Sequence, residues 1–195
     1  MIEAFGRTDV GRRRKINEDA LLVSPETSLY AVCDGMGGHN AGEVASGLAI
    51  ETLADFIATS AVERDVTWPW GLDANLSFDA NRLKTAIRLA NTRVYQAAEK
   101  REELTGMGTT VVACLIDGRR ATVAHVGDSR AYLLRDGRLH RLTTDHTIVA
   151  ELVARAGEAR RDAVVVSSGG VIAAVCAQLL GEPDGMVVPL NRVCV

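Results

Sequence analysis

Apolar positions along the chain fall into two groups of short runs, separated by two long stretches with helical spacing. In those stretches apolar residues recur every three or four positions, which is typical of one buried helix face. The pattern predicts helices over residues 41–61 and 77–101, the second with Ser77 as its N-cap. The short apolar runs predict strands. These are residues 2–9, 20–23, 29–33, 109–116, 121–126, 131–134 and 138–142.

Turn residues separate these elements. Gly11–Lys15 and Ser24–Thr27 lie on either side of the second strand, and residues 62–76 lack periodicity and are predicted to be a loop. Asp117-Gly118 and Asp136-Gly137 are strong hairpin signals. Beyond Asp145 the pattern predicts a helix over 146–156, a strand over 163–167, a Gly-Gly turn, a helix over 170–180 and a short final strand.

Two batches of strands with two long helices between them favour an α+β fold over a doubly wound parallel sheet, in which strands and helices would alternate. We expect an antiparallel β-sandwich flanked by helices. The hairpin signals support antiparallel pairing because tight turns join only antiparallel neighbours.

The composition narrows the classes of partner. The 195 residues are 47% hydrophobic and 24% charged, which suits one soluble domain with a sizeable core. The net charge of −3 gives no overall basic field for nucleic acid, and the one basic cluster, Arg12–Lys15, is short. Residues 163–181 are uncharged, but Ser167-Ser168-Gly169-Gly170 interrupts them, so we expect no membrane span there.

The cysteines indicate a reducing compartment. Four cysteines are scattered without metal-ligand spacing, and three of them lie inside apolar runs, as buried reduced thiols do. The N-terminus is polar and charged, unlike a signal peptide. We therefore expect a cytoplasmic protein.

The stretch most indicative of chemistry is Val32-Cys33-Asp34-Gly35-Met36-Gly37-Gly38-His39. An apolar strand ends abruptly in the carboxylate of Asp34, and glycines follow it closely. Glycine lets backbone carbonyls approach whatever that carboxylate binds, and hard divalent cations prefer carboxylate and carbonyl oxygens. The alternative is a strand followed by a glycine-rich turn that Asp34 merely caps.

Other acidic residues also lie at strand ends or turns. Glu18-Asp19 precede one strand, and Asp128 follows another. Together with Asp34 they could form a magnesium or manganese site, and Arg14 could bind a phosphate. Each has a plainer interpretation as a solvated turn or surface residue, and His39 alone is more often a surface histidine than an acid or a ligand.

Five motifs occur in the order found in one known family. They are Arg14-x-x-Asn17-Glu18-Asp19-Ala20, Asp34-Gly35-Met36-Gly37-Gly38-His39, Gly106-Met107-Gly108-Thr109-Thr110, Val126-Gly127-Asp128-Ser129-Arg130-Ala131-Tyr132 and Leu142-Thr143-Thr144-Asp145-His146. Residues 6 to about 158 thereby resemble the bacterial branch of the metal-dependent (PPM, type-2C) serine/threonine protein phosphatases. The family fold is a sandwich of two antiparallel sheets flanked by helices.

The resemblance implies a set of roles. Asp34 would bridge two Mn²⁺ or Mg²⁺ ions, the Gly35 carbonyl would bind one of them, and Glu18 would support the other. Arg14 would bind the substrate phosphate, and Asp128 would serve a further metal or its surroundings. Asp19 and His39 would lie behind these ligands. The implied reaction is in-line attack of metal-activated water on phosphoserine or phosphothreonine.

The family pattern fails after about residue 158. Gly169 and Leu190 stand where the family has two further metal-binding aspartates. Residues 162–195 instead resemble the C-terminal part of the histidine (phosphoglycerate-mutase-like) phosphatases, with Ser168 where that family has histidine. We therefore divide the chain into a truncated phosphatase domain, 1–158, and an atypical strand–helix–strand segment, 159–195, and we expect the sandwich to be incomplete at this end.

Two functions follow. The first is a phosphoprotein phosphatase that acts on phosphorylated protein substrates, with a Ser/Thr kinase and its targets as partners and without nucleic acid or membrane. The second is a catalytically impaired pseudophosphatase, or a truncated or fused product, that binds phosphopeptide or metal weakly. The absent aspartates favour the second, because carboxylates supply most of the affinity for a second metal.

Overall fold

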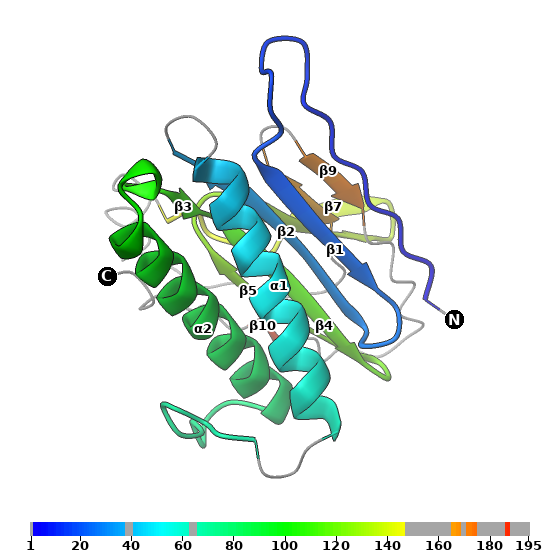
Figure 1. Cartoon of the computed structure of the whole chain (residues 1–195). Helices are drawn as coiled ribbons and strands as arrows, with labels where there is room; N and C mark the ends of the chain where they lie inside the picture. The colour runs from blue at the N-terminus through cyan, green and yellow to red at the C-terminus, as the bar shows by residue number, and fades with distance from the viewer. Residues whose placement is uncertain are drawn as a thin grey trace.

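The structure is a computed structural model that describes residues 2–37, 41–62 and 66–146, together with the backbone of three short strands at 165–168, 171–174 and 186–187. Figure 1 shows two β-sheets with two long helices on one side. The strands are β1 (Asp19–Ser24), β2 (Leu29–Met36), β3 (Gly108–Thr109), β4 (Val111–Asp117), β5 (Arg120–Val126), β6 (Arg130–Arg135), β7 (Arg138–Arg141), β8 (Val165–Ser168), β9 (Val171–Ala174) and β10 (Met186–Val187). The helices are α1 (Ala41–Val62), α2 (Phe78–Lys100) and a short 3-10 helix, η1 (Glu102–Leu104).

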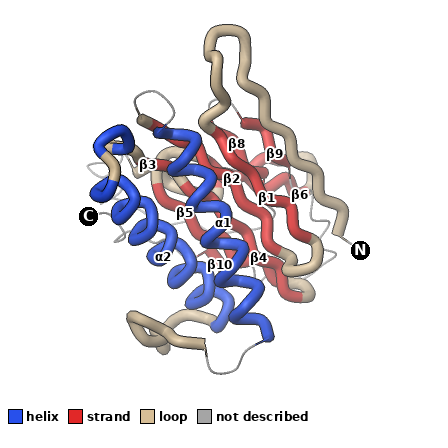
Figure 2. Tube along the Cα trace, viewed as in Figure 1, coloured by secondary structure: helices blue, strands red, loops and turns tan. Residues whose placement is uncertain are grey.

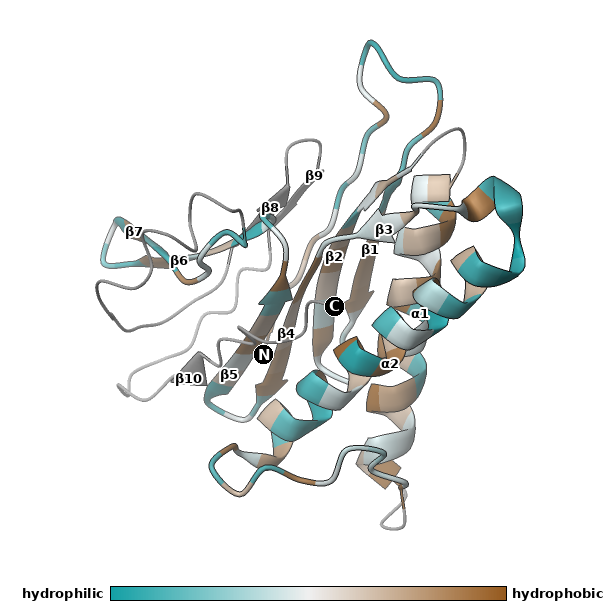
Figure 3. Cartoon of the chain, turned by 90° about the vertical axis from the view of Figure 1, so that its left-hand side faces the viewer, coloured by the Kyte–Doolittle hydropathy of each residue, from teal (hydrophilic) through white to brown (hydrophobic). Residues whose placement is uncertain are grey.

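The larger sheet has the order β1-β2-β4-β5-β10, with β3 paired to the end of β2. The smaller sheet has the order β7-β6-β8-β9. All pairings are antiparallel except that of β10, which runs parallel to β5. Seen from the side, the two sheets form separate layers, and α1 and α2 cover the outer face of the larger one (Figure 3). The predicted α+β sandwich with flanking helices is confirmed.

Strand β2 lies in the middle of this arrangement and is buried on both faces. Leu29, Ala31 and Cys33 point into the core beneath the helices. Tyr30 and Val32 point into a second core between the sheets. Because side chains alternate along a strand, Asp34 continues the inter-sheet face and Gly35 continues the helix face. This alternation decides what each of these two residues can contact.

Helix α1 lies on the larger sheet with Leu53 and Ile57 fully buried. By length and apolar composition, α1 is the one helix in the described part of the chain that could cross a membrane. Its burial against β2 is that of a core helix in a globular protein. Arg82 of α2 is also buried and donates to the Ile57 carbonyl at 2.7 Å and to Ser60 Oγ at 2.9 Å, which ties α2 to the end of α1.

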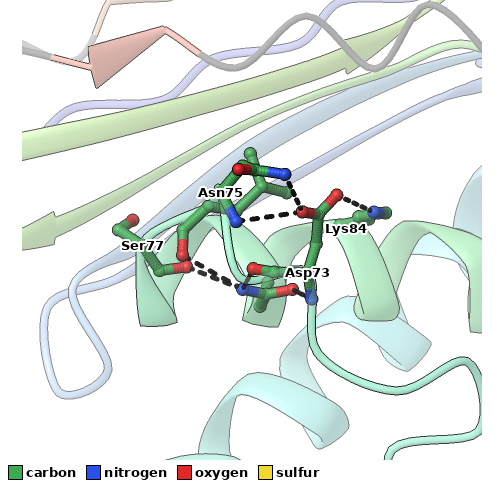
Figure 4. A network of polar contacts seen from close by, with 6 residues as sticks. Asp73, Asn75, Ser77 and Lys84 are labelled. Atoms are coloured by element: carbon green, nitrogen blue, oxygen red, sulfur yellow. Dashed lines mark hydrogen bonds and ion pairs between the residues drawn. The ribbon is translucent and has the colours of Figure 1, made fainter.

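Helix α2 begins where the sequence predicts. The Ser77 side chain accepts a hydrogen bond from the Ala80 amide at 3.1 Å, as an N-cap does. The loop before it is fixed by Asp73, whose carboxylate accepts from the Asn75 amide at 3.1 Å and from Lys84 Nζ at 3.1 Å (Figure 4). Asp73 therefore orients the chain as it enters α2.

Two predicted elements are wrong. The strand predicted over residues 2–9 does not form, since residues 2–7 have no strand structure and Thr8 makes only an isolated bridge. A Cβ at Gly6 would lie 2.9 Å from the side chains of both Leu21 and Val23, so this segment packs across β1 side chains instead of pairing with a strand edge. In the helix predicted over 170–180, Val171–Ala174 form a strand instead, where β9 pairs with β8, and the rest of that range lies outside the described residues. The β-branched residues Val171 and Ile172 favour this hairpin.

The other predicted strands up to 163–167 are confirmed, with small shifts of their ends, whereas the final strand predicted after Asn191 lies outside the described residues. The Asp136-Gly137 turn has positive φ at both residues (51° and 72°), which the type I′ hairpin requires. Of the helix predicted over 146–156, only His146 is described, and it is not helical; the rest lies outside the described residues, as do the positions Gly169 and Leu190.

Candidate metal centre

Two carboxylates meet at the end of the larger sheet where β1 begins. The antiparallel register places Asp19 directly opposite Asp34. Opposite residues in such a pair lie on the same face of the sheet, so both side chains lie on the inter-sheet side. Glu18 immediately precedes Asp19, which brings a third acidic residue to this end.

Burial and repulsion make Asp19 difficult to ionise. Burial is the main cause that raises the pKa of Asp19 from its ordinary value of 3.8 to about 6, and the neighbouring carboxyl of Asp34 adds to it. Arg14 acts in the opposite direction, lowering this pKa. The Asp19 Oδ1 atom is buried without a hydrogen-bond partner. A crowded carboxylate pair with an unpaired buried oxygen is what a bound cation would stabilise.

Glycine is required where α1 approaches the strand ends. A Cβ at Gly35 would overlap the Gly42 carbonyl, and a Cβ at Gly42 would lie 2.6 Å from Glu18 Oε1. The Gly35 amide donates to the Glu18 carbonyl at 3.1 Å, and Ser46 Oγ of α1 donates to the same oxygen at 2.7 Å. The start of α1 therefore holds the Glu18 backbone and side chain next to Gly35.

A pair of threonines fixes the backbone of Asp34. Its amide donates to Thr110 Oγ1 at 3.0 Å, and its carbonyl accepts from the Thr110 amide at 2.9 Å and from Thr109 Oγ1 at 3.1 Å. Thr110 Oγ1 is also hydrogen-bonded to Ser129 Oγ at 2.7 Å. The Thr110 side chain thus connects Asp34 to the loop that carries Asp128.

That connection gives a physical role to two of the sequence motifs. A Cβ at Gly127, where φ is +96°, would lie 2.7 Å from Thr110 Cγ2, so the loop can approach Thr110 this closely only with glycine at this position. The threonine and serine contacts were not assigned by sequence reasoning. The signal was present, since Gly106–Thr110 and Val126–Tyr132 had been singled out as motifs without a role for their hydroxyl groups.

The structure does not bring the other predicted site residues as close to the Asp19–Asp34 pair. Arg14 is exposed, and its Nη1 lies 3.5 Å from Glu18 Oε2. Asp128 is exposed on the loop after β5, and its neighbour Ser129 connects this loop to Asp34 through Thr110. His39 lies outside the described residues. The structure therefore brings Glu18, Asp19 and Asp34 together, with Arg14 at their edge.

A second cluster lies behind the Asp128 loop. Arg130 donates to both carboxylate oxygens of Asp145, at 3.0 and 2.7 Å, and this fork lowers the pKa of Asp145. In the sequence Asp145 only precedes a predicted helix, and its contact with Arg130 was not predicted. His125 and His146 stack nearby with ring centroids 4.6 Å apart, and burial lowers the pKa of His125. The cluster fixes the chain on both sides of Asp128.

The residues present partly fit a divalent cation. Carboxylate oxygens, the unpaired Asp19 Oδ1 and a glycine next to Asp34 are suitable surroundings for Mn²⁺ or Mg²⁺. Yet no group of three or more His, Cys, Asp or Glu side chains in the described part of the chain is arranged to hold a metal. The described side chains could therefore supply only part of a ligand set.

Comparison with known proteins identifies the family. Residues 6–173 match the family described as Protein phosphatase 2C. The chain belongs to this family. The match continues past residue 158, where the family motifs end, and includes β8 and part of β9.

Relatives of this family member are bacterial serine/threonine phosphatases. It is 43% identical over 147 residues to serine/threonine protein phosphatase PstP of Mycobacterium tuberculosis, covering 75% of this chain and 26% of that protein. It is 38% identical over 163 residues to serine/threonine phosphatase stp of Listeria welshimeri, covering 80% of this chain and 59% of that protein. The chain thus spans less than two thirds of either relative.

Solved structures agree with this assignment. The catalytic domain of PstP in complex with two manganese ions matches with a TM-score of 0.64 and 40% identity, over 79% of this chain and 60% of that one. The resemblance that the five motifs indicated is thereby confirmed for the family and for its fold. The resemblance of residues 162–195 to histidine phosphatases stays a prediction.

Proposed function

We propose that this chain is a protein serine/threonine phosphatase that uses Mn²⁺ or Mg²⁺ to hydrolyse phosphoserine and phosphothreonine. The observation that carries the proposal is the Asp19–Asp34 carboxylate pair, opposite one another on β1 and β2, with a buried oxygen that lacks a partner. Family membership and the two manganese ions in the PstP structure support it.

Each residue has a specific part in this proposal. Asp34 and the Gly35 carbonyl would hold the metal, Glu18 would support a second ion, and Asp128 would serve an additional one. The ions would supply an activated water and neutralise charge on the phosphoryl oxygens. Arg14 would bind the substrate phosphate through its guanidinium group. Asp19 and His39 would lie behind these ligands, and the threonine contacts would keep Asp34 in position.

One observation favours a second candidate function. The described side chains do not form a complete ligand set, and the two positions where the family has further aspartates are Gly169 and Leu190. A chain of this kind would bind phosphopeptide or metal weakly and turn over little substrate. The two candidates differ in turnover, not in fold.

Partners and location follow from the same proposal. The substrates would be phosphorylated proteins, including a Ser/Thr kinase and its targets, without a nucleic-acid or membrane partner. A cytoplasmic location is supported by Cys33 and Cys114, which are buried and unbridged.

Turnover of a small aryl phosphate with and without Mn²⁺ tests the catalytic proposal. We expect manganese-dependent hydrolysis that falls at least a hundredfold in Asp34→Asn, because this change removes one negative charge at the centre of the site. Asp136→Asn, in the β6–β7 turn, is a matched control that should retain full activity. Wild-type protein without turnover would leave the pseudophosphatase candidate, and full activity in Asp34→Asn would show that the site lies elsewhere.

A further inference from the structure

We propose that the basic loop, defined as residues 11–15, selects phosphorylated segments that carry acidic residues beside the phosphorylated one. The residues that would make this selection are Arg12, Arg13 and Lys15. The inference deepens the proposed function, since it concerns the substrates of the same site. It assigns a role to the three residues of the basic cluster Arg12–Lys15 that the carboxylate centre does not use, since the fourth, Arg14, is already the proposed phosphate ligand.

The loop lies beside the proposed site and projects from it. Figure 2 shows the loop that precedes β1 extending beyond the end of the sheet where β1 begins and β2 ends. Asp19 and Asp34 are paired at this same end. A protein segment that reaches the carboxylates from this side would therefore pass the basic loop.

The base of the loop is held in place. Asn17 Nδ2 donates to Thr8 Oγ1 at 2.7 Å, which joins the two ends of the projecting segment. Asn17 Oδ1 accepts from the Asp19 amide at 3.1 Å, which joins that base to the carboxylate centre. At the tip, Gly11 adopts φ +71° and its amide donates to Asp9 Oδ1 at 2.8 Å, forming a local turn. The loop thus presents its cations at a fixed place relative to Asp19.

Arg14 and the neighbouring Arg7 are paired with carboxylates, whereas the other three cations of the basic loop are not. Arg7 pairs with Asp9 at 3.8 Å, and Arg14 pairs with Glu18 at 3.5 Å. Arg12, Arg13 and Lys15 are exposed, and within the described residues they make no hydrogen bond or ion pair. Three unpaired positive charges therefore stand together on a chain whose net charge is −3.

Charge complementarity favours an acidic peptide as the occupant. Arg14 lies in the same run and is the proposed phosphate ligand, so residues that flank a bound phosphoresidue would lie near Arg12, Arg13 and Lys15. Aspartate or glutamate at those flanking positions would be attracted, and lysine or arginine would be repelled. A membrane or nucleic acid would call for a broad basic face, which a chain with this net charge does not provide.

Binding of labelled peptides tests this inference independently of turnover. Two fluorescent peptides carry a phosphonate analogue of phosphoserine, which resists hydrolysis, flanked either by aspartates or by alanines. Fluorescence anisotropy gives the dissociation constant of each at low salt. Wild-type protein should bind the acidic peptide about tenfold more tightly, and 0.5 M salt should remove most of that preference, because exposed charges are screened.

The decisive variant is R12Q/R13Q/K15Q, which leaves Arg14 and the carboxylates intact. It should bind both peptides with similar affinity and hydrolyse the aryl phosphate at the wild-type rate. The matched control is R119Q/R120Q/R138Q, which removes the same amount of charge. Arg119 and Arg120 lie at the β4–β5 turn, at the other end of the sheet from the site. This control should keep the preference for the acidic peptide.

Each possible result separates this inference from the proposed function. Equal affinity of wild-type protein for the two peptides, no measurable binding of either while the aryl phosphate is still hydrolysed, or a preference that survives in R12Q/R13Q/K15Q would overturn the inference. If R12Q/R13Q/K15Q lost the binding of wild-type protein to anionic vesicles or to an RNA oligonucleotide but kept the peptide preference, the loop would be assigned to those partners instead. Absence of aryl-phosphate turnover with the acidic preference intact would contradict catalysis alone.

Discussion

At the scale of single residues, the site depends on one unfavourable pair. Asp19 and Asp34 are held opposite each other by the β1–β2 register, and burial makes their repulsion stronger than it would be in water. The backbone compensates, because Asp34 makes hydrogen bonds to Thr109 and Thr110 through both its amide and its carbonyl. The pair is therefore kept in place by the backbone and the threonines around it.

Burial of Asp19, together with this repulsion, predicts a pH dependence of stability in metal-free protein. Between its ordinary pKa of 3.8 and its folded pKa of about 6, Asp19 retains a proton in the folded chain that the unfolded chain has released. The free energy of unfolding therefore falls as pH rises from about 4 to about 6 and does not recover above it. Asp19→Asn removes this loss. The variant should melt at a higher temperature than wild type at pH 7.5, and at nearly the same temperature at pH 4.

Thermal melts in chelator at pH 4, 5, 6 and 7.5 provide the measurement. Asp55→Asn, an exposed position on α1, is the control and should follow the wild-type curve. If the melting temperatures of wild type and Asp19→Asn changed in parallel with pH, Asp19 would be shown to ionise normally.

At the scale of elements, the start of α1 shapes the site through two glycines. Helix α1 approaches β2 so closely that Gly35 and Gly42 leave no room for a Cβ, and the Glu18 carboxylate lies against Gly42. Gly47, one and a half turns further along the same helix, has open space around it. Close packing therefore requires glycine at position 42 of α1 but not at position 47, so substitutions at these two positions can be compared directly.

Gly47→Ala should raise the free energy of unfolding by about 0.5–1 kcal/mol, because alanine is the better helix former and meets no neighbour. Gly42→Ala should lower it by about 1–3 kcal/mol, because the new methyl group would lie 2.6 Å from Glu18 Oε1 and 3.0 Å from the Gly35 backbone. Urea denaturation of the two variants measures both effects. A Gly42→Ala protein as stable as Gly47→Ala would mean that α1 does not press on the strand ends.

At the scale of the whole molecule, the sandwich brings together motifs that are far apart in the sequence. Gly108–Thr110 reach Asp34 because β3 pairs with the end of β2 and β4 follows directly. The loop after β5 reaches it because β4 and β5 form a hairpin whose far end meets the same edge. The result is one end of the larger sheet at which five segments of the chain contribute to a single site.

Much of this architecture could be predicted from the sequence because its signals are local. Helix spacing, the Ser77 cap and the Asp136-Gly137 turn are set by residues within a few positions of one another. The errors arose where distant packing decides. Residues 2–7 have an apolar pattern but pack over Leu21 and Val23, and Val171–Ala174 follow a Gly-Gly signal that fits a hairpin as well as a helix start.

For the site, the sequence indicated which residues gather but not how they are held. A carboxylate after an apolar strand, followed by glycines, pointed to Asp34. The Thr110–Ser129 contact joins residues that are far apart in the sequence, so only the folded sheet brings them into contact. The exposed position of Asp128 likewise depends on the course of its loop.

The central claim is that this chain keeps a metal site centred on Asp34, and calorimetric titration with Mn²⁺ tests it most directly. We predict saturable binding by the wild-type chain and at least tenfold weaker binding by Asp34→Asn, with Asp136→Asn unchanged. The reason is that Asp34 would contribute a carboxylate ligand, whereas Asp136 lies in a hairpin turn of the other sheet. Absence of saturable binding in the wild-type chain, or equal affinity in Asp34→Asn, would contradict the account.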